Sequence, residues 1–224
     1  MTVILVLLSF VTLLAIDAIY SKSRNIQPIL QAEARHANAV PARLQPNMIA
    51  GFAVQPNVRY HPGHTWALSE SPNLVRVGMD DFAGKLIWKL DTVTLPQRGQ
   101  WVRQGQKLAT IDREGVKIDL VSPIEGSISD INEAVIKNPA LAKQDPYGDG
   151  WLVTVQAPDT KTNFRNLLSG SVARSWMEEA AERLHARMPS PAGALAQDGG
   201  VAVGNMGEHV SGNFAEIAKE FFLS

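Results

Sequence analysis

Short apolar segments separated by glycine and proline turns constrain the fold of this chain more than any other feature. Between about Arg59 and Pro158, runs of a few apolar residues alternate with turns such as Pro96–Gly99 and Arg103–Gly105. Strands this short, with no long helical period between them, favour a small sandwich or barrel over a parallel α/β sheet. The predicted fold class is therefore mainly β (α+β). The expected strands are residues 75–79, 85–95, 128–131 and 151–155, and residues 108–118 are expected to form a hairpin.

Short helices are expected beside these strands. Asp80 and Asn132 are suitable N-cap residues, for a helix through Phe82 and for a helix over 133–137. A longer helix is predicted over 171–187, where every fourth residue is apolar and would pack on the barrel. The residues of this stripe are Val172, Trp176, Ala180 and Leu184.

Composition excludes several classes of function. The net charge is −1 and both signs are interspersed, so no nucleic-acid surface is indicated. The chain has no cysteine, which removes disulfides, thiolate nucleophiles, iron–sulfur clusters and cysteine zinc sites. Redox or acyl chemistry would therefore need an added cofactor, and no catalytic residue is predicted.

Residues 1–20 form an apolar run of the length that a membrane-spanning helix needs. Asp17 and Tyr20 suit the interface at its end, and the basic residues Lys22 and Arg24 follow it while none precede it. The sequence thus predicts a single-pass anchor in the inner (cytoplasmic) membrane with the soluble part facing the cytoplasm. A cleaved signal peptide is the alternative, although no basic region precedes the run.

Two further segments have the composition of connectors. Residues 21–58 contain four prolines and are predicted to form a tether. Residues 188–212 are rich in Gly, Ala and Pro and are predicted to form a flexible linker. Residues 213–224 form a short amphipathic helix, which gains stability by docking. The segment has two acidic residues, Glu216 and Glu220, and only one basic residue, Lys219. A groove on a partner protein is therefore favoured over anionic lipid as its docking site.

Some polar clusters invite a metal-site interpretation. His61 and His64 could be grouped with Asp80 and Asp81, and the loop 145–150 faintly resembles a calcium loop. Neither has the ligand spacing of an established motif, so structural roles are predicted and no metal site is expected.

The pattern of residues Ala109–Pro123 predicts two strands joined by a tight turn. This segment resembles the lipoyl-lysine hairpin of the glycine cleavage system H protein. The resemblance covers about 100 residues and implies a barrel-sandwich hybrid, a lipoyl-type domain placed at residues 59–187. The family carries a lipoyl arm between partner enzymes. Further resembling blocks, in the same order, are Tyr60–Trp66, Val77–Ala83, Leu95–Gly99, Ser122–Gly126, Ile131–Pro139 and Asp145–Trp151.

One position departs from the family pattern. The family's modified lysine lies seven residues before the serine of a Ser-Pro pair, which here is Ser122, so the count reaches Gly115. Glu114 and Gly115 look like the centre of a tight turn, and glycine has no amine to acylate. Lys117 is the nearest amine, but two residues along a strand displace it by about 6 to 7 Å.

Two functions follow from these observations. The first is a docking or scaffold module without a cofactor, which binds protein partners through the hairpin end and the 213–224 helix and the membrane through residues 1–20. The alternative is a carrier with a lipoyl group on Lys117 that shuttles an aminomethyl or acyl group, or electrons, between partner enzymes.

Overall fold

The structure is a computed structural model that describes residues 46–188 and 214–223. The predicted membrane segment 1–20 lies outside these residues. Within the described ranges, no helix is both long and apolar enough to cross a membrane.

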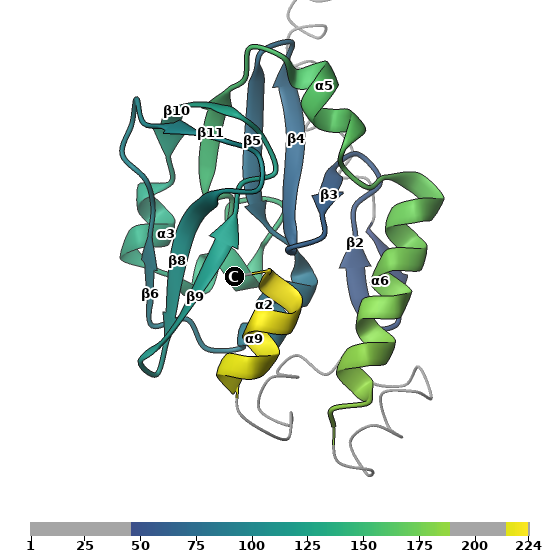
Figure 1. Cartoon of the computed structure of the whole chain (residues 1–224). Helices are drawn as coiled ribbons and strands as arrows, with labels where there is room; N and C mark the ends of the chain where they lie inside the picture. The colour runs from purple at the N-terminus through teal and green to yellow at the C-terminus, as the bar shows by residue number, and fades with distance from the viewer. Residues whose placement is uncertain (1–45, 189–213, 224) are drawn as a thin grey trace, which may run out of the picture. The chain divides into compact units, whose positions relative to one another are not determined.

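Antiparallel sheets form the body of the protein, as the sequence predicted (Figure 1). The larger sheet has six strands in the order β3-β4-β5-β11-β10-β7, and the smaller has three in the order β6-β8-β9. The larger sheet comprises β3 (Arg59–His61), β4 (Thr65–Ser71), β5 (Leu74–Met79), β11 (Val153–Gln156), β10 (Gly126–Ile131) and β7 (Trp101–Val102). The smaller sheet comprises β6 (Thr92–Thr94), β8 (Lys107–Arg113) and β9 (Val116–Val121).

Both sheets contribute to one hydrophobic core. Val77 and Val155 from the larger sheet and Ile111, Ile118 and Leu120 from the smaller sheet are all completely buried. The helices lie around the sheets: α2 (Asp81–Ile87), α3 (Glu133–Lys137), α4 (Ala140–Gln144), α5 (Thr160–Arg165), α6 (Gly170–His185) and α9 (Phe214–Phe222). The expectation of a mainly β fold with short flanking helices is confirmed.

Local capping signals start two of these helices, as predicted. The Asp80 carboxylate accepts a hydrogen bond from the Ala83 amide at 2.8 Å and begins α2. The Asn132 side chain accepts from the Ala134 amide at 3.1 Å and begins α3. Each bond satisfies a backbone donor that the first turn of a helix leaves unpaired.

The predicted strand over residues 85–95 is wrong in its first half. Lys85–Ile87 belong to α2, which ends at Ile87 with Trp88 as its C-cap, and the strand β6 covers only Thr92–Thr94. The Asp80 cap starts a helix whose Phe82 and Leu86 both lie on its buried side. An apolar run this short fits a helical or an extended period equally well, so the cap decides between them.

The predicted tether 21–58 also needs correction at its C-terminal end. Residues Asn47–Ile49 (β1) and Phe52–Val54 (β2) form an antiparallel hairpin within it. Phe52 is completely buried, with its ring 4.8 Å from the ring of Phe82. The folded body therefore begins before Arg59, because this hairpin packs on α2 through the ring of Phe52 and through hydrogen bonds.

The long helix α6 is confirmed, but its buried face differs from the predicted stripe. Ala173, Met177, Ala180 and Leu184 are buried, whereas Val172 is 59% exposed. Residues four apart advance about 40° beyond a full turn, so a strict four-residue stripe drifts around the helix. The mixed spacing of four, three and four keeps the true stripe on one side.

Candidate functional site

The hairpin of β8 and β9 places residues 114 and 115 at its tip. Arg113 pairs with Val116, so the loop contains only Glu114 and Gly115. Their φ angles are +51° and +83°, both in the left-handed region. Two successive residues with positive φ are typical of the type I′ turn, which matches the twist of a two-residue hairpin. The tight turn predicted from the sequence is present.

Carboxylates hold this turn by its backbone. Asp91 accepts a hydrogen bond from the Glu114 amide at 2.6 Å, and Asp112 accepts from the Gly115 amide at 2.9 Å. Lys89 donates to the Glu114 carboxylate at 3.1 Å, and this hydrogen bond together with the charge of Asp91 raises the pKa of Lys89. Both amides of the turn are thus bonded, which favours one conformation of the tip.

Lys117 lies on β9 rather than in the turn. It is exposed and stands opposite Asp112 in the strand ladder. Nearby, Asp119 is held by Lys107 at 2.8 Å and by the Thr110 hydroxyl at 2.8 Å. Burial raises the pKa of Asp119, but these hydrogen bonds outweigh it and lower that pKa overall. The Lys117 amine is accessible, yet the tip of the hairpin carries Gly115.

Space does not exclude a side chain at position 115. A Cβ atom built there would meet nothing within 4 Å, and the residue is exposed. Its φ of +83° is the restriction, because an L side chain in the left-handed region crowds the following carbonyl. Glycine at this position therefore serves the turn, and it leaves residue 115 without an amine.

Aromatic side chains flank the Arg113 end of the hairpin. The guanidinium of Arg113 lies 3.7 Å from the ring centre of Phe214 and 5.6 Å from that of Trp88. Arg113 is only 8% exposed, and its burial lowers its pKa. The sequence did not indicate this cluster, because its members come from the C-cap of α2, from β8 and from α9.

The histidines and aspartates that suggested a metal site serve separate structural bonds. His64 Nδ1 lies 2.9 Å from the Asp80 carboxylate, and both side chains are buried. His61 Nδ1 accepts from the Gly63 amide at 3.0 Å, and burial, followed by the charge of His64, lowers the pKa of His61. Asp81 accepts from the Ala53 amide and pairs with Lys85. The structural roles predicted for these residues are observed.

The loop that resembled a calcium site is a turn held by hydrogen bonds among its own residues. The Asp145 carboxylate accepts from the Asp149 amide at 3.0 Å, and the Asp145 carbonyl accepts from the Gly150 amide at 2.9 Å. The turn places the Tyr147 hydroxyl against the Ala53 carbonyl at 2.7 Å. It thereby connects the β1–β2 hairpin to the rest of the body.

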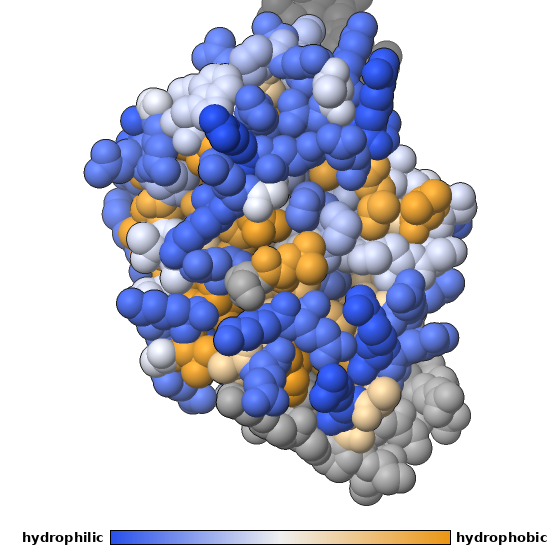
Figure 2. Space-filling view, in the orientation of Figure 1, coloured by the Kyte–Doolittle hydropathy of each residue, from blue (hydrophilic) through white to orange (hydrophobic). Residues whose placement is uncertain are grey.

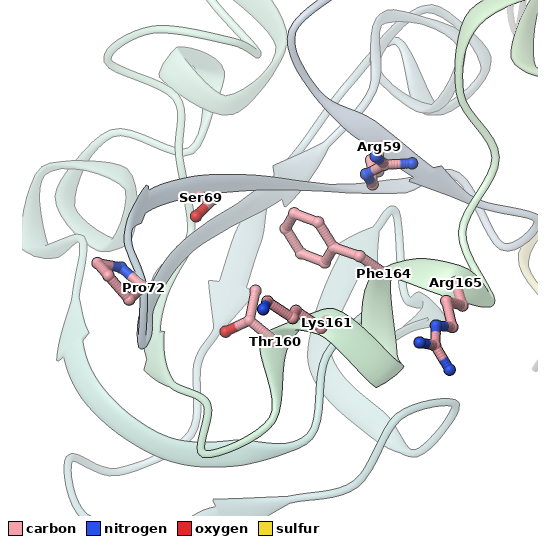
Figure 3. A pocket seen from close by; sticks show the side chains of 7 residues that line it. All are labelled: Arg59, Ser69, Pro72, Thr160, Lys161, Phe164 and Arg165. Carbon is pink, nitrogen blue, oxygen red and sulfur yellow. The ribbon is translucent and has the colours of Figure 1, made fainter.

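A shallow basic hollow lies between the β4–β5 turn and α5 (Figure 3). Its volume is about 580 Å³, and the sequence did not indicate it. The Arg59 guanidinium lies 5.4 Å from the centre of the Phe164 ring and donates to Ser169 at 2.9 Å. The arginine is therefore already engaged within the body. The lining residues are Arg59, Ser69, Pro72, Thr160, Lys161, Phe164 and Arg165.

Comparison with known proteins places residues 58–180 in the family model "Glycine cleavage H-protein". A probable glycine cleavage system H protein of Aeropyrum pernix is 33% identical over 118 residues, which are 53% of this chain and 81% of that protein. The glycine cleavage system H protein of Legionella pneumophila is 37% identical over 113 residues, 50% of this chain and 89% of that protein.

A solved structure of the H protein from Mycobacterium marinum covers 57% of this chain and 98% of its own, with 28% identity and a TM-score of 0.49. The family model spans more than half of the chain, and the relatives match it over most of their own length. The chain belongs to the glycine cleavage H-protein family.

Proposed function

We propose that this chain is an H-protein-family domain without a lipoyl group, which serves as a docking module for partner proteins. One observation carries the proposal: Gly115 occupies the hairpin tip where the family resemblance expects the modified lysine. Glycine has no amine, and its positive φ is what the two-residue turn requires.

The position of Lys117 supports the same conclusion. An attaching enzyme must bring the amine to a fixed place in its own active site, and positioned chemistry loses rate steeply when an atom is misplaced by about 1 Å. Lys117 lies two strand residues from the tip, which is a displacement of about 6 to 7 Å. A shift of β9 by one residue would turn buried Ile118 and Leu120 outward. The two-residue shift that would bring Lys117 to the tip keeps each side chain on its face of the sheet, but it changes the turn and the pairing of the strands.

A carrier with the lipoyl group on Lys117 is the second candidate. It is favoured by the exposure of the Lys117 side chain beside the turn. In that case the chain would transfer an aminomethyl or acyl group, or electrons, between partner enzymes.

Intact mass separates these two functions. We expect protein purified from its native host to have the mass of the unmodified chain, and the Lys117→Arg variant to behave like the wild type. A mass increase of one lipoyl group that maps to Lys117 and disappears in Lys117→Arg would establish the carrier instead. A Gly115→Lys variant is the matched positive control, because it places an amine at the tip.

The proposal includes attachment to the inner membrane through residues 1–20, with the folded body in the cytoplasm. The apolar length of this run and the basic residues that follow it support this location. A docking module held at a membrane would concentrate its partners there.

A further inference from the structure

The C-terminal helix α9 packs on the chain's own body. Its apolar face consists of Ile217, Ala218, Phe221 and Phe222, each at most 3% exposed. Glu216 and Lys219 on the opposite face are exposed. In Figure 1, α9 lies beside β9 and over α2, and Figure 2 shows hydrophilic side chains interspersed with hydrophobic ones at the same place. The sequence had predicted a groove on a partner protein or the membrane surface as the docking site.

Aromatic rings form the floor beneath α9. The ring of Phe221 lies 5.1 Å from that of Phe82, and the rings of both Phe221 and Phe222 lie 6.2 Å from the ring of His64. His64 itself stacks on Phe82 at 4.1 Å. Burial of two phenylalanines against aromatic neighbours is the main attraction that holds this helix.

Gly63 allows the end of α9 to approach closely. A Cβ atom at this position would lie 3.2 Å from the Phe222 carbonyl oxygen and 2.7 Å from the Val121 side chain. Val121 is the last residue of β9, while Phe214 at the other end of α9 stacks on Arg113 at the end of β8. The helix therefore runs alongside β9 from the hairpin turn to the far end of the strand.

Three arginines surround the helix. Arg113 lies over Phe214 at 3.7 Å, Arg183 lies over Phe221 at 5.3 Å, and Arg187 pairs with Glu220 at 2.8 Å. Cations favour the faces of aromatic rings and the carboxylates of a bound helix. We use the name α9-binding surface for Gly63, His64, Phe82, Arg113, Val121, Arg183 and Arg187.

Because α9 is short, its helical conformation depends on packing against another surface. Isolated helices shorter than about 12 to 15 residues are marginal in water, and α9 has nine residues. It follows α6 only after residues 189–213, whose sequence has linker composition. A short amphipathic helix that lays its apolar face on such a surface is a recurring mode of recognition between proteins.

We propose that the α9-binding surface is a docking site for an amphipathic helix of a partner protein, and that α9 is the chain's own occupant, which the partner displaces. The partner helix would carry two adjacent aromatic residues, an aliphatic residue four positions before the first of them, and an acidic residue beside them. Displacement would also remove Phe214 from Arg113, and so would expose the end of the hairpin to the same partner.

Spin labels can test the exchange in the full chain, because it has no cysteine of its own. Lys219→Cys on α9 and Glu179→Cys on α6 are both exposed labelling sites. We expect one narrow distance distribution, which broadens when a synthetic peptide of residues 213–224 is added. A tethered ligand has an effective concentration on the order of millimolar, so half-displacement is expected at roughly millimolar peptide. A peptide with Phe221→Ala and Phe222→Ala is the control and should have no effect.

A second variant measures the surface directly. With Phe221→Ala and Phe222→Ala in the full chain, α9 should leave, and a fluorescent peptide of residues 213–224 should bind at least tenfold more tightly than it binds the wild type. Circular dichroism reports whether this variant remains folded. Should it unfold, Glu220→Gln, which removes only the pair with Arg187, should still lower the peptide concentration needed for displacement.

Two results would overturn the inference. The first is a distance distribution that stays narrow at tenfold above millimolar peptide, which would make α9 a permanent part of the core. The second is a distribution that changes when labelled chain is diluted with unlabelled chain, which would make a second copy the occupant. The inference rests on the proposed docking function, but these readouts do not depend on lipoylation. If the protein carried a lipoyl group and α9 still exchanged with the peptide, only the proposal of a chain without a lipoyl group would be wrong.

Discussion

At the scale of single residues, the hairpin tip carries Gly115 at the position where the family resemblance expects the modified lysine. Glu114 and Gly115 both have positive φ, and two carboxylates bind their amides. The turn therefore keeps the geometry that displays residue 115, although this residue has no side chain. Lys117 lies in the regular ladder of β9, where it stands opposite Asp112.

We predict that Gly115→Ala destabilises the protein by about 1 kcal/mol, because an L side chain at this φ crowds the following carbonyl. No steric contact obscures the effect, since a Cβ there meets nothing within 4 Å. Urea unfolding followed by tryptophan fluorescence measures it. The matched control is Lys117→Ala on the adjacent strand, which should stay within about 0.5 kcal/mol of the wild type. Equal losses in the two variants would contradict a backbone origin.

At the scale of elements, the β1–β2 hairpin belongs to the body because of its contacts with α2. Besides the ring of Phe52 on Phe82, the Asp81 carboxylate accepts from the Ala53 amide at 2.7 Å, and Lys85 donates to the Gly51 carbonyl at 2.7 Å. An isolated two-stranded hairpin is marginally stable at best. These contacts with a neighbouring helix explain why it forms here.

We predict that Phe52→Ala costs about 3 to 5 kcal/mol, the range for removing a fully buried aromatic side chain. Equilibrium unfolding of this variant, compared with Met48→Ala on β1, provides the measurement. Met48 is 58% exposed, so its replacement should change stability by no more than about 0.5 kcal/mol. If both variants were as stable as the wild type, residues 47–54 would be part of the tether after all.

At the scale of the whole molecule, the folded body combines the two larger sheets and the β1–β2 hairpin with helices around them. β9 is an edge strand of the smaller sheet, and α9 lies beside it. Exposed edge strands invite pairing with other chains, and a covering helix prevents this. Release of α9 would therefore open both an apolar surface and a strand edge close to the hairpin.

We predict that deletion of residues 1–20 moves the protein from the membrane fraction to the soluble fraction of its host, because the apolar run needed to span a bilayer is then missing. Fractionation followed by immunoblotting checks this outcome. Deletion of residues 213–224 serves as the control and should leave the protein with the membrane. A soluble protein after the second deletion would instead assign the attachment to the C-terminal helix.

Signals that act within a few residues could be interpreted from the sequence. The caps Asp80 and Asn132 and the turn at Glu114 and Gly115 were predicted, because each depends on bonds or φ angles within three residues of itself. The mainly β fold followed from the turn pattern, and the absence of an amine at position 115 followed from counting back from Ser122. These properties belong to the chain before any tertiary contact forms.

Only the tertiary structure decided which segments pack together. The sequence alone did not assign residues 47–54 to the body, because their burial depends on α2, about thirty residues later (Ala53 to Asp81 spans 28). The surface that receives α9 could not be predicted from the sequence either, since Gly63, Phe82 and Arg113 lie in three separate segments of the chain. Hydrophobic attraction is non-directional, so an amphipathic pattern shows that a face will be buried but does not specify its partner.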